Sequence, residues 1–157
     1  MGDAETTLVV QFDMDGHRFG LYACDVVEIL RAATPSPLPG APAVVSGLLN
    51  VRGALMPVYD VRSRFRLQAR PMRATDHLIV AQIGRTVAFV VDQVHALVAV
   101  PTADIAAAQA LPAPSAGVSG VARLADGLVV IVDLRGFLSE AESAQLDAAL
   151  GQPGGGS

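Results

Sequence analysis

The sequence contains no lysine and no tryptophan, and it has a single cysteine among its 157 residues. All eleven basic residues are therefore arginines, and they are scattered rather than gathered in a basic run interleaved with aromatic residues. Such a run is what neutralises and stacks on a nucleic acid, so we expect no nucleic-acid partner. The single cysteine, Cys24, excludes a disulfide bond within the chain.

The sequence also has few residues that could carry out chemistry. Cys24 and three separated histidines fall short of the four nitrogen or sulfur ligands of a structural zinc, so we predict no metal and no cofactor. The phosphate-binding glycine loop, the serine nucleophile motif and the metalloprotease helix motif are all missing. Asp60, Asp92 and Asp133 each end a predicted strand, and two of them could act as the carboxylates of a hydrolase. We interpret them instead as turn residues that accept backbone N–H bonds, and we predict that the protein is not an enzyme.

Two long stretches lack charged residues, residues 32–51 and residues 105–122. Each is long enough to raise the question of a membrane span. Prolines and glycines interrupt both, so neither can close the hydrogen-bond ladder of a helix in lipid. We therefore expect apolar loops on the protein surface, no insertion into a membrane and a cytoplasmic protein.

The sequence is rich in branched aliphatic residues. Hydrophobic residues make up 52% of the chain and aromatic residues only 4%, so Val, Leu, Ile and Ala must form the core. Branching at Cβ favours extended backbone. Turn pairs such as Asp15-Gly16 and Asp126-Gly127 separate the apolar runs, as in β-hairpins. The predicted strands cover residues 8–14, 18–23, 44–51, 54–61, 78–83, 86–91, 94–100, 118–124 and 128–134.

Three short helices are predicted between and after these strands. Asp25 is placed to cap a helical turn that follows it. Ser139 and Glu142 have the spacing of a capping box, which predicts the start of a final helix. The predicted helices cover residues 26–31, residues 62–67 and residues 139–150.

The two halves of the chain repeat each other. Residues 47–62 align without gaps on residues 120–135, and both stretches run from a glycine to an Asp-apolar-Arg triplet. Neither half is large enough to bury a core alone, so we expect two small β-barrels that pack together. We predict one domain over residues 8–150, with two lobes divided near residues 68–76 and the chain crossing between them. A flexible tail is expected over residues 151–157.

Two charged residues lie in apolar surroundings, and each has two interpretations. Glu28 follows two valines and either faces water or takes part in binding. Arg52 occupies a predicted hairpin turn, where no partner within the chain is evident, and is either a solvated turn residue or a contact to a partner protein. In the second case the apolar segment of residues 38–49 would supply hydrophobic contact.

The residues of this chain resemble the CheW adaptors of bacterial chemotaxis over roughly residues 8–138. The most specific stretch runs from Gly47 through Asn50, Arg52 and Gly53 to the Pro-Val-Tyr-Asp sequence that ends at Asp60. Four further pieces follow the family pattern in the same order along the chain. They are Phe19-Gly-Leu-Tyr-Ala-Cys-Asp-Val26 with Glu28-Ile-Leu30, Pro39-Gly-Ala-Pro42, Val90-Val-Asp92-Gln-Val94 and Leu128-Val-Val-Ile-Val-Asp133-Leu134.

The resemblance implies an all-β fold of two five-stranded SH3-like barrels, packed together, with short helices and a C-terminal helix. It implies an adaptor that couples chemoreceptors, the methyl-accepting chemotaxis proteins, to the histidine kinase CheA. The cytoplasmic tip of the receptor would lie between the barrels, and other surfaces would meet the regulatory domain of CheA. The positions carried over to the receptor contact are Val26, Glu28, Gly47 and Arg52. Asn50, Gly53, Asp60 and Asp133 are expected to be structural turn residues.

Some positions depart from the family pattern. Residues 21–23 read Leu-Tyr-Ala where Leu-Pro-Ile is usual, and Ala96 stands where an acidic residue is common. Two alternative functions also remain open. The chain could be an excised CheW-like regulatory domain of a CheA-type kinase, or the adaptor half of a CheW–receiver fusion.

Overall fold

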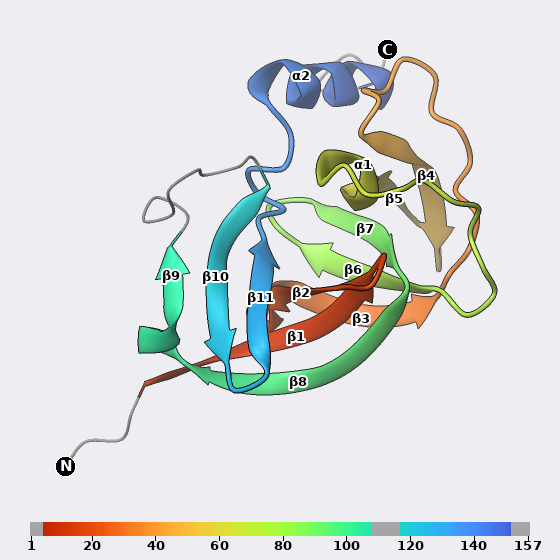
Figure 1. Ribbon diagram of the computed structural model, residues 1–157. Coiled ribbons are helices and arrows are strands. Elements are labelled where there is room, and N and C mark those ends of the chain that lie inside the picture. The colour runs from red at the N-terminus through yellow and green to blue at the C-terminus, as the bar shows by residue number, and fades with distance from the viewer. Residues whose placement is uncertain (1–4, 108–116, 152–157) are drawn as a thin grey trace.

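The computed structural model describes residues 5–107 and 117–151, and two sheets of strands dominate it (Figure 1). One sheet has the strand order β8-β1-β2-β11-β10-β9, and the other has the order β3-β6-β7-β5-β4. The strands are β1 Thr6–Met14, β2 His17–Tyr22, β3 Val26–Arg31, β4 Val45–Val51, β5 Ala54–Tyr59, β6 His77–Gln82, β7 Thr86–Val91, β8 Gln93–Pro101, β9 Ile105–Ala107, β10 Val118–Leu124 and β11 Gly127–Val132. The helices are α1 Val61–Arg64 and α2 Glu140–Ala149, with 3-10 turns at Ala23–Asp25 and Thr102–Asp104.

The chain exchanges strands between the two sheets. It starts in the first lobe (β1, β2 and β8–β11), crosses to the second lobe (β3–β7) after β2, and returns after β7. Both lobes therefore contain a strand that continues directly from the other lobe. The prediction of an all-β fold in two packed lobes is confirmed, except that β9 gives the first lobe a sixth strand.

The repeat seen in the sequence is a repeat of pairing geometry. Val45 pairs with Tyr59 in the β4–β5 hairpin, and the equivalent Val118 pairs with Val132 in the β10–β11 hairpin. The register shifts at the same place in both hairpins, directly before Gly47 and Gly120. The second strand of each hairpin also pairs in parallel with a strand from the other half of the chain. These pairs are β5 with β7 and β11 with β2.

The largest core lies between the lobes rather than inside either one. It includes Phe12, Phe19, Phe89 and Phe137, and Leu146 of α2 is fully buried in it. Smaller clusters fill the lobes themselves, around Ile131 in the first lobe and around β4–β7 in the second. The lobes are thus stabilised mainly by packing against each other, as expected for barrels too small to stand alone.

Helix α2 covers the second lobe at one end of the molecule (Figure 1). The predicted capping box is confirmed, because Ser139 Oγ accepts the Glu142 N–H and the Glu142 carboxylate accepts the Ser139 N–H. Arg64 of α1 donates to the same carboxylate at 2.8 Å, and Arg85 in the β6–β7 turn pairs with Asp147. The helix is therefore fixed to two separate parts of the second lobe.

The helix predicted over residues 26–31 is wrong, because this segment is strand β3. Its residues alternate between partly buried and exposed, and they pair with β6 from Val26 to Arg31. The β-branched residues Val26, Val27 and Ile29 favour this geometry over a helix. The helical turn lies one step earlier, at Ala23–Asp25, and Asp25 ends it rather than capping a helix.

The other boundaries differ less. The helix predicted over residues 62–67 is the shorter α1, whose N-cap is Asp60. The loop predicted over residues 105–122 contains β9 and most of β10, and residues 108–116 lie outside the described part. Residues 152–157 of the expected tail also lie outside it. Among the described residues, no helix is long and apolar enough to cross a membrane.

Candidate functional site

Strands β3 and β4 are the two outer strands of the second sheet, and an ion pair of two predicted site residues joins their ends of the sheet, at a place that we call the seam. The guanidinium of Arg52 donates to the carboxylate of Glu28. Arg52 lies in the β4–β5 turn with a φ of +50°, and the turn is held by the Asn50 side chain, which accepts the Gly53 N–H at 2.8 Å. The contact connects β3, one outer strand of the sheet, with the turn that follows β4, the other outer strand.

The ion pair corrects the expectation that Arg52 has no partner within the chain. The Arg52 side chain is still 67% exposed and that of Glu28 is 29% exposed. Exposed pairs of this kind contribute about 0–1 kcal/mol to folding stability. Both side chains therefore remain available to a binding partner at little cost.

Exposed apolar side chains occur on the strands that carry this pair and next to it in the sequence. A register shift in β3 between Val26 and Glu28 turns Val27 outward, where it is 56% exposed. Ile29 is also exposed, and Leu55 is 67% exposed on β5. Val26 itself is partly buried against the core between the lobes. A lobe that combines an exposed ion pair with exposed aliphatic side chains on the neighbouring positions of β3 and β5 is suited to contact an amphipathic helix.

Gly47 lies on the same seam but is covered by the chain itself. Ser36 forms an isolated antiparallel bridge with Leu48, next to Gly47. Gly47 is buried, and a Cβ added to it would lie 2.2 Å from the carbonyl oxygen of Ser36. The segment that contains Ser36 was not singled out from the sequence, because its prolines indicated only a loop.

The first lobe has the same scaffold without the ion pair. Ala96 and Ala125 occupy the positions equivalent to Glu28 and Arg52. Leu97 and Leu128, equivalent to Ile29 and Leu55, are again exposed. The charged pair thus distinguishes the two lobes at otherwise matching edges.

The carboxylates of the acidic turn residues Asp60 and Asp133 accept hydrogen bonds from backbone N–H groups. Asp60 Oδ1 accepts the Ser63 N–H at 3.1 Å, and the equivalent Asp133 Oδ1 accepts the Gly136 N–H at 3.0 Å. The backbone N–H of each aspartate donates to equivalent carbonyls, those of Val44 and Gly117. These bonds give both residues a structural part in the two hairpins.

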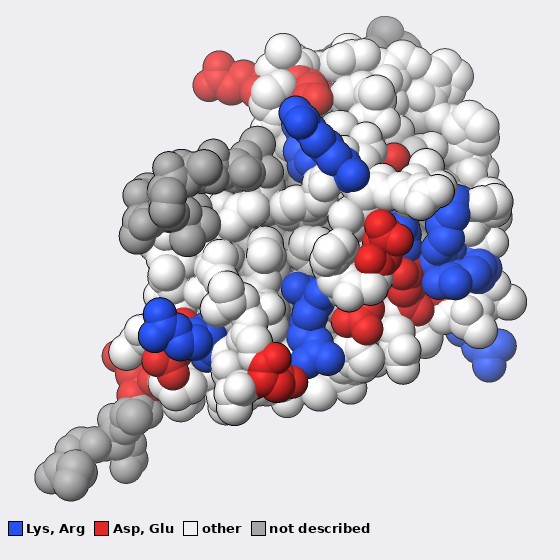
Figure 2. All heavy atoms as spheres, in the orientation of Figure 1, with Lys and Arg blue, Asp and Glu red and all other residues white. Residues whose placement is uncertain are grey.

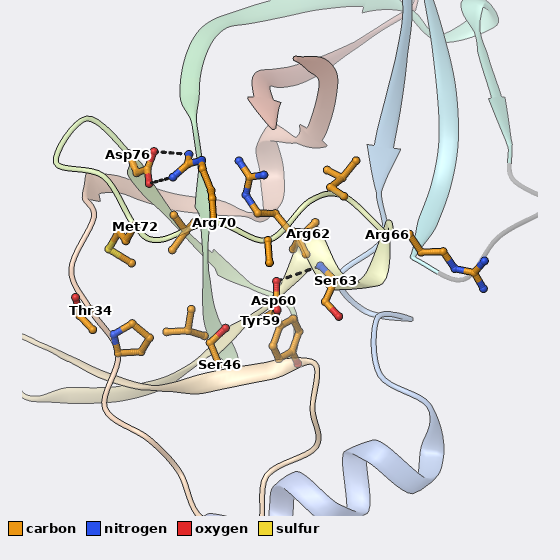
Figure 3. Close-up of a pocket in the computed structure, with 16 residues that line it drawn as sticks. Thr34, Ser46, Tyr59, Asp60, Arg62, Ser63, Arg66, Arg70, Met72 and Asp76 are labelled. Atoms are coloured by element: carbon orange, nitrogen blue, oxygen red, sulfur yellow. Dashed lines mark hydrogen bonds and ion pairs between the residues drawn. The ribbon is translucent and has the colours of Figure 1, made fainter. Parts of the chain in front are cut away.

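A pocket of about 540 Å³ lies beside α1, between β4, β5 and the connector that follows α1 (Figure 3). Arg70 donates two hydrogen bonds to Asp76 in this pocket, at 2.7 and 2.8 Å, and a third to Asp92. Arg62 donates to Asp92 and to the carbonyl oxygen of Gln68. Arg66 points away from the pocket in the close-up. The arginines that face the pocket are thus already paired within the chain.

These pairs shift the pKa values of the two aspartates. The hydrogen bonds from Arg70 lower the pKa of Asp76 to about 2, against the opposing effect of burial. Burial would raise the pKa of Asp92, but the N–H of Asp15 and the guanidinium of Arg62 lower it overall. Both groups are therefore held as carboxylates, which suits a structural network better than proton transfer.

Charges on the visible face of the molecule alternate in sign rather than forming one large patch (Figure 2). Within residues 5–107 and 117–151, no group of three His, Cys, Asp or Glu side chains could hold a metal ion. Cys24 is an exposed free thiol. Of the surfaces described here, the seam that carries Glu28 and Arg52 is therefore the one best suited to bind a protein partner.

The chain is similar to known proteins over most of its length. The family model described as CheW-like domain matches residues 8–142. A chemotaxis protein CheW of Treponema pallidum is 24% identical over 148 residues, which is 88% of this chain and 85% of that protein. A chemotaxis protein CheW of Klebsiella aerogenes is 27% identical over 144 residues, covering 87% and 84% of the two chains.

The fold also matches a solved structure. The crystal structure of the scaffolding protein TtCheW from Thermoanaerobacter tengcongensis superimposes with a TM-score of 0.79 at 24% identity, covering 88% of this chain and 96% of that one. The family model matches well over half of the chain. The chain therefore belongs to the family of CheW-like domains, the scaffold and adaptor proteins of bacterial chemotaxis.

Proposed function

We propose that this protein couples the cytoplasmic tips of chemoreceptors to the regulatory domain of a CheA-type histidine kinase. The observation that carries the proposal is the exposed Glu28–Arg52 pair at the seam of the second lobe, on strands that also expose Val27, Ile29 and Leu55. A receptor tip is a helical hairpin, and such a partner needs an apolar surface and a few oriented charges. The seam offers both.

In this proposal Glu28 and Arg52 contact the receptor directly. Val26 is partly buried and acts through its exposed neighbour Val27. The charges would fix the position of the helix along the seam, because opposite charges set register more than affinity. The exposed aliphatic side chains of this lobe would supply most of the buried area. Other surfaces of the barrels would contact the kinase.

The protein acts in this proposal as a cytoplasmic scaffold and not as an enzyme. Arg62 and Arg70 of the described pocket are paired with aspartates, and the acidic turn residues accept backbone N–H bonds. These contacts supply positioning and leave no convergent acid–base pair among them. The output would be the geometry of an assembly, through which receptor state changes kinase activity.

Reconstitution tests the proposal. Kinase autophosphorylation is measured with receptor-containing membranes, with and without this protein. We expect kinase activity to depend on the receptor only when the protein is added. Unchanged kinase activity, with no co-sedimentation of the protein with receptor membranes, would exclude the adaptor function. Binding to the receptor without any kinase contact would favour an excised fragment or half of a fusion.

A further inference from the structure

The family resemblance predicts that Gly47 contacts the receptor, but Gly47 is buried beneath Ser36 and Pro35, so a partner cannot touch it. Its backbone has a φ of +155°, and an added Cβ would lie 2.2 Å from the carbonyl oxygen of Ser36 and 3.3 Å from Pro35. Real Cβ atoms do not come this close to a backbone oxygen. The space over Gly47 is thus filled by the chain's own segment of residues 34–37.

This segment is held to β4 by a single backbone bridge. The Ser36 N–H donates to the Leu48 carbonyl, and the Leu48 N–H donates to the Ser36 carbonyl, both at 2.8 Å. Pro35 and Pro37 on either side of Ser36 have no N–H to donate. The bridge therefore cannot spread along the segment, and it depends on the close approach that a glycine at position 47 allows.

The first lobe contains the same device at the equivalent position. A Cβ added to Gly120 would lie 2.6 Å from the carbonyl oxygen of Ala106. Gly120 pairs with Ala107, so the glycine there lets β9 add to the edge of β10. In each lobe a glycine of the repeated hairpin thus lets another segment approach the outer edge, strand β9 in the first lobe and the Ser36 bridge in the second. Among the described residues, the second lobe alone combines this segment with a charged pair at the Glu28 and Arg52 positions.

Two contacts join β3 and the segment that follows it to the β4–β5 hairpin. The first contact is the ion pair of Glu28 with Arg52, and the second is the bridge of Ser36 with Leu48. In Figure 1 the segment between β3 and β4 runs along the outside of the second lobe. Thr34, Ser36 and Pro37 are exposed, and Thr34 and Pro35 also line the pocket beside α1, so the segment adds a partly apolar rim along β4.

We propose that Gly47 is a positioning residue, which holds residues 34–37 against β4 so that this segment forms one wall of the receptor-binding surface. Gly47 does not touch the partner. The inference rests on the proposed function, since it takes the receptor tip as the partner. It predicts that any change that releases the segment weakens receptor binding, even when Gly47 itself is unchanged.

Three variants of the full chain test this, with a receptor-tip helical hairpin as the probe. Gly47→Ala forces Ser36 away, and Ser36→Pro removes the N–H donor of the bridge and leaves Gly47 intact. Gly120→Ala places a similar clash in the first lobe and serves as the matched control. Affinity is measured by titration, and release of the segment by hydrogen exchange at the Leu48 N–H.

We expect Gly47→Ala and Ser36→Pro each to weaken binding by about tenfold or more, with faster exchange at Leu48. Gly120→Ala should lower the melting temperature and leave affinity unchanged. Equal loss of affinity in all three variants would overturn the inference, because it would reflect general destabilisation. Intact binding in Ser36→Pro, with fast exchange at Leu48, would overturn it as well.

Arg52→Glu separates this inference from the proposed function. If Arg52→Glu weakens binding and the two segment variants do not, the surface is right and the role of Gly47 is wrong. If Arg52→Glu also leaves binding intact, the proposed receptor surface itself is wrong.

Discussion

The guanidinium of Arg135 donates two hydrogen bonds to the carboxylate of Asp25, at 2.9 and 3.0 Å. Asp25 stands at the crossing from β2 to β3, and Asp92 stands at the return crossing from β7 to β8. Asp92 is paired with Arg62, which the sequence repeat aligns with Arg135. Each crossing between the lobes is therefore held by an arginine from the end of a repeated hairpin.

Removing Arg135 should destabilise the fold. The Asp25 side chain is only 10% exposed, and among the described residues Arg135 is its one ion-pair partner. We expect Arg135→Ala to lower the free energy of unfolding by about 1–3 kcal/mol in urea denaturation, because it leaves a nearly buried carboxylate unpaired. Adding Asp25→Ala should restore part of the loss.

The control for this prediction is Arg123→Ala, an exposed arginine on the β10–β11 hairpin. This change should alter the free energy of unfolding by no more than about 0.5 kcal/mol. Equal effects of Arg123→Ala and Arg135→Ala would show that the Asp25 contact does not hold the crossing.

Acid should weaken the fold through Asp76. Its pKa of about 2 lies below its ordinary value of 3.8, because Arg70 stabilises the carboxylate. The contribution of Asp76 to stability is therefore present above its unfolded pKa and is lost as the pH falls through its folded pKa. Asp92 and Glu142 shift in the same direction.

We expect the free energy of unfolding to decrease as the pH falls from about 4 to about 2. Asp76→Asn should make this decrease smaller and should lower stability at neutral pH. Asp104→Asn, at an exposed position without an ion pair in the described chain, serves as the control. An unchanged pH dependence in Asp76→Asn would contradict the assigned role of the Arg70 contact.

The capping box of α2 gives a third prediction. Ser139→Ala removes the side chain that accepts the Glu142 N–H, and such losses cost about 0.5–2 kcal/mol. Because Leu146 is buried between the lobes, fraying of α2 should appear as faster hydrogen exchange along the helix. Ser143→Ala, inside the same helix, should not lower stability, since alanine favours helix. A loss in Ser143→Ala equal to that in Ser139→Ala would count against the cap.

Local sequence signals predicted most strands. Asp15-Gly16 and Arg52-Gly53 mark turns that the structure contains, and the aligned halves predicted two related lobes. The prediction of a helix over residues 26–31 is wrong because it relies on Asp25, a capping signal that acts only locally. The pairing of Val26 with Ala81, which makes this segment a strand, joins residues far apart in the sequence. Strand β3 gains its backbone hydrogen bonds only once the second lobe closes.

The site was harder to predict for the same reason. The family resemblance points to Glu28 and Arg52, but their contact exists only in the folded lobe, where it joins β3 to the turn after β4 at the opposite end of the sheet. The bridge at Ser36 lies within a proline-rich segment that gives no strand signal. Side chains and backbone groups brought together by barrel closure leave no periodic pattern in the sequence.

The central claim concerns Arg52, and one titration tests it most directly. A receptor-tip helical hairpin is titrated into the protein, into Arg52→Glu and into Arg123→Glu, an equal charge reversal on the equivalent hairpin of the first lobe. We predict that Arg52→Glu binds at least about tenfold more weakly, with a melting temperature within about 2 °C of the unchanged protein. Arg123→Glu should bind normally. Normal binding in Arg52→Glu, or equal loss in both variants, would contradict the account.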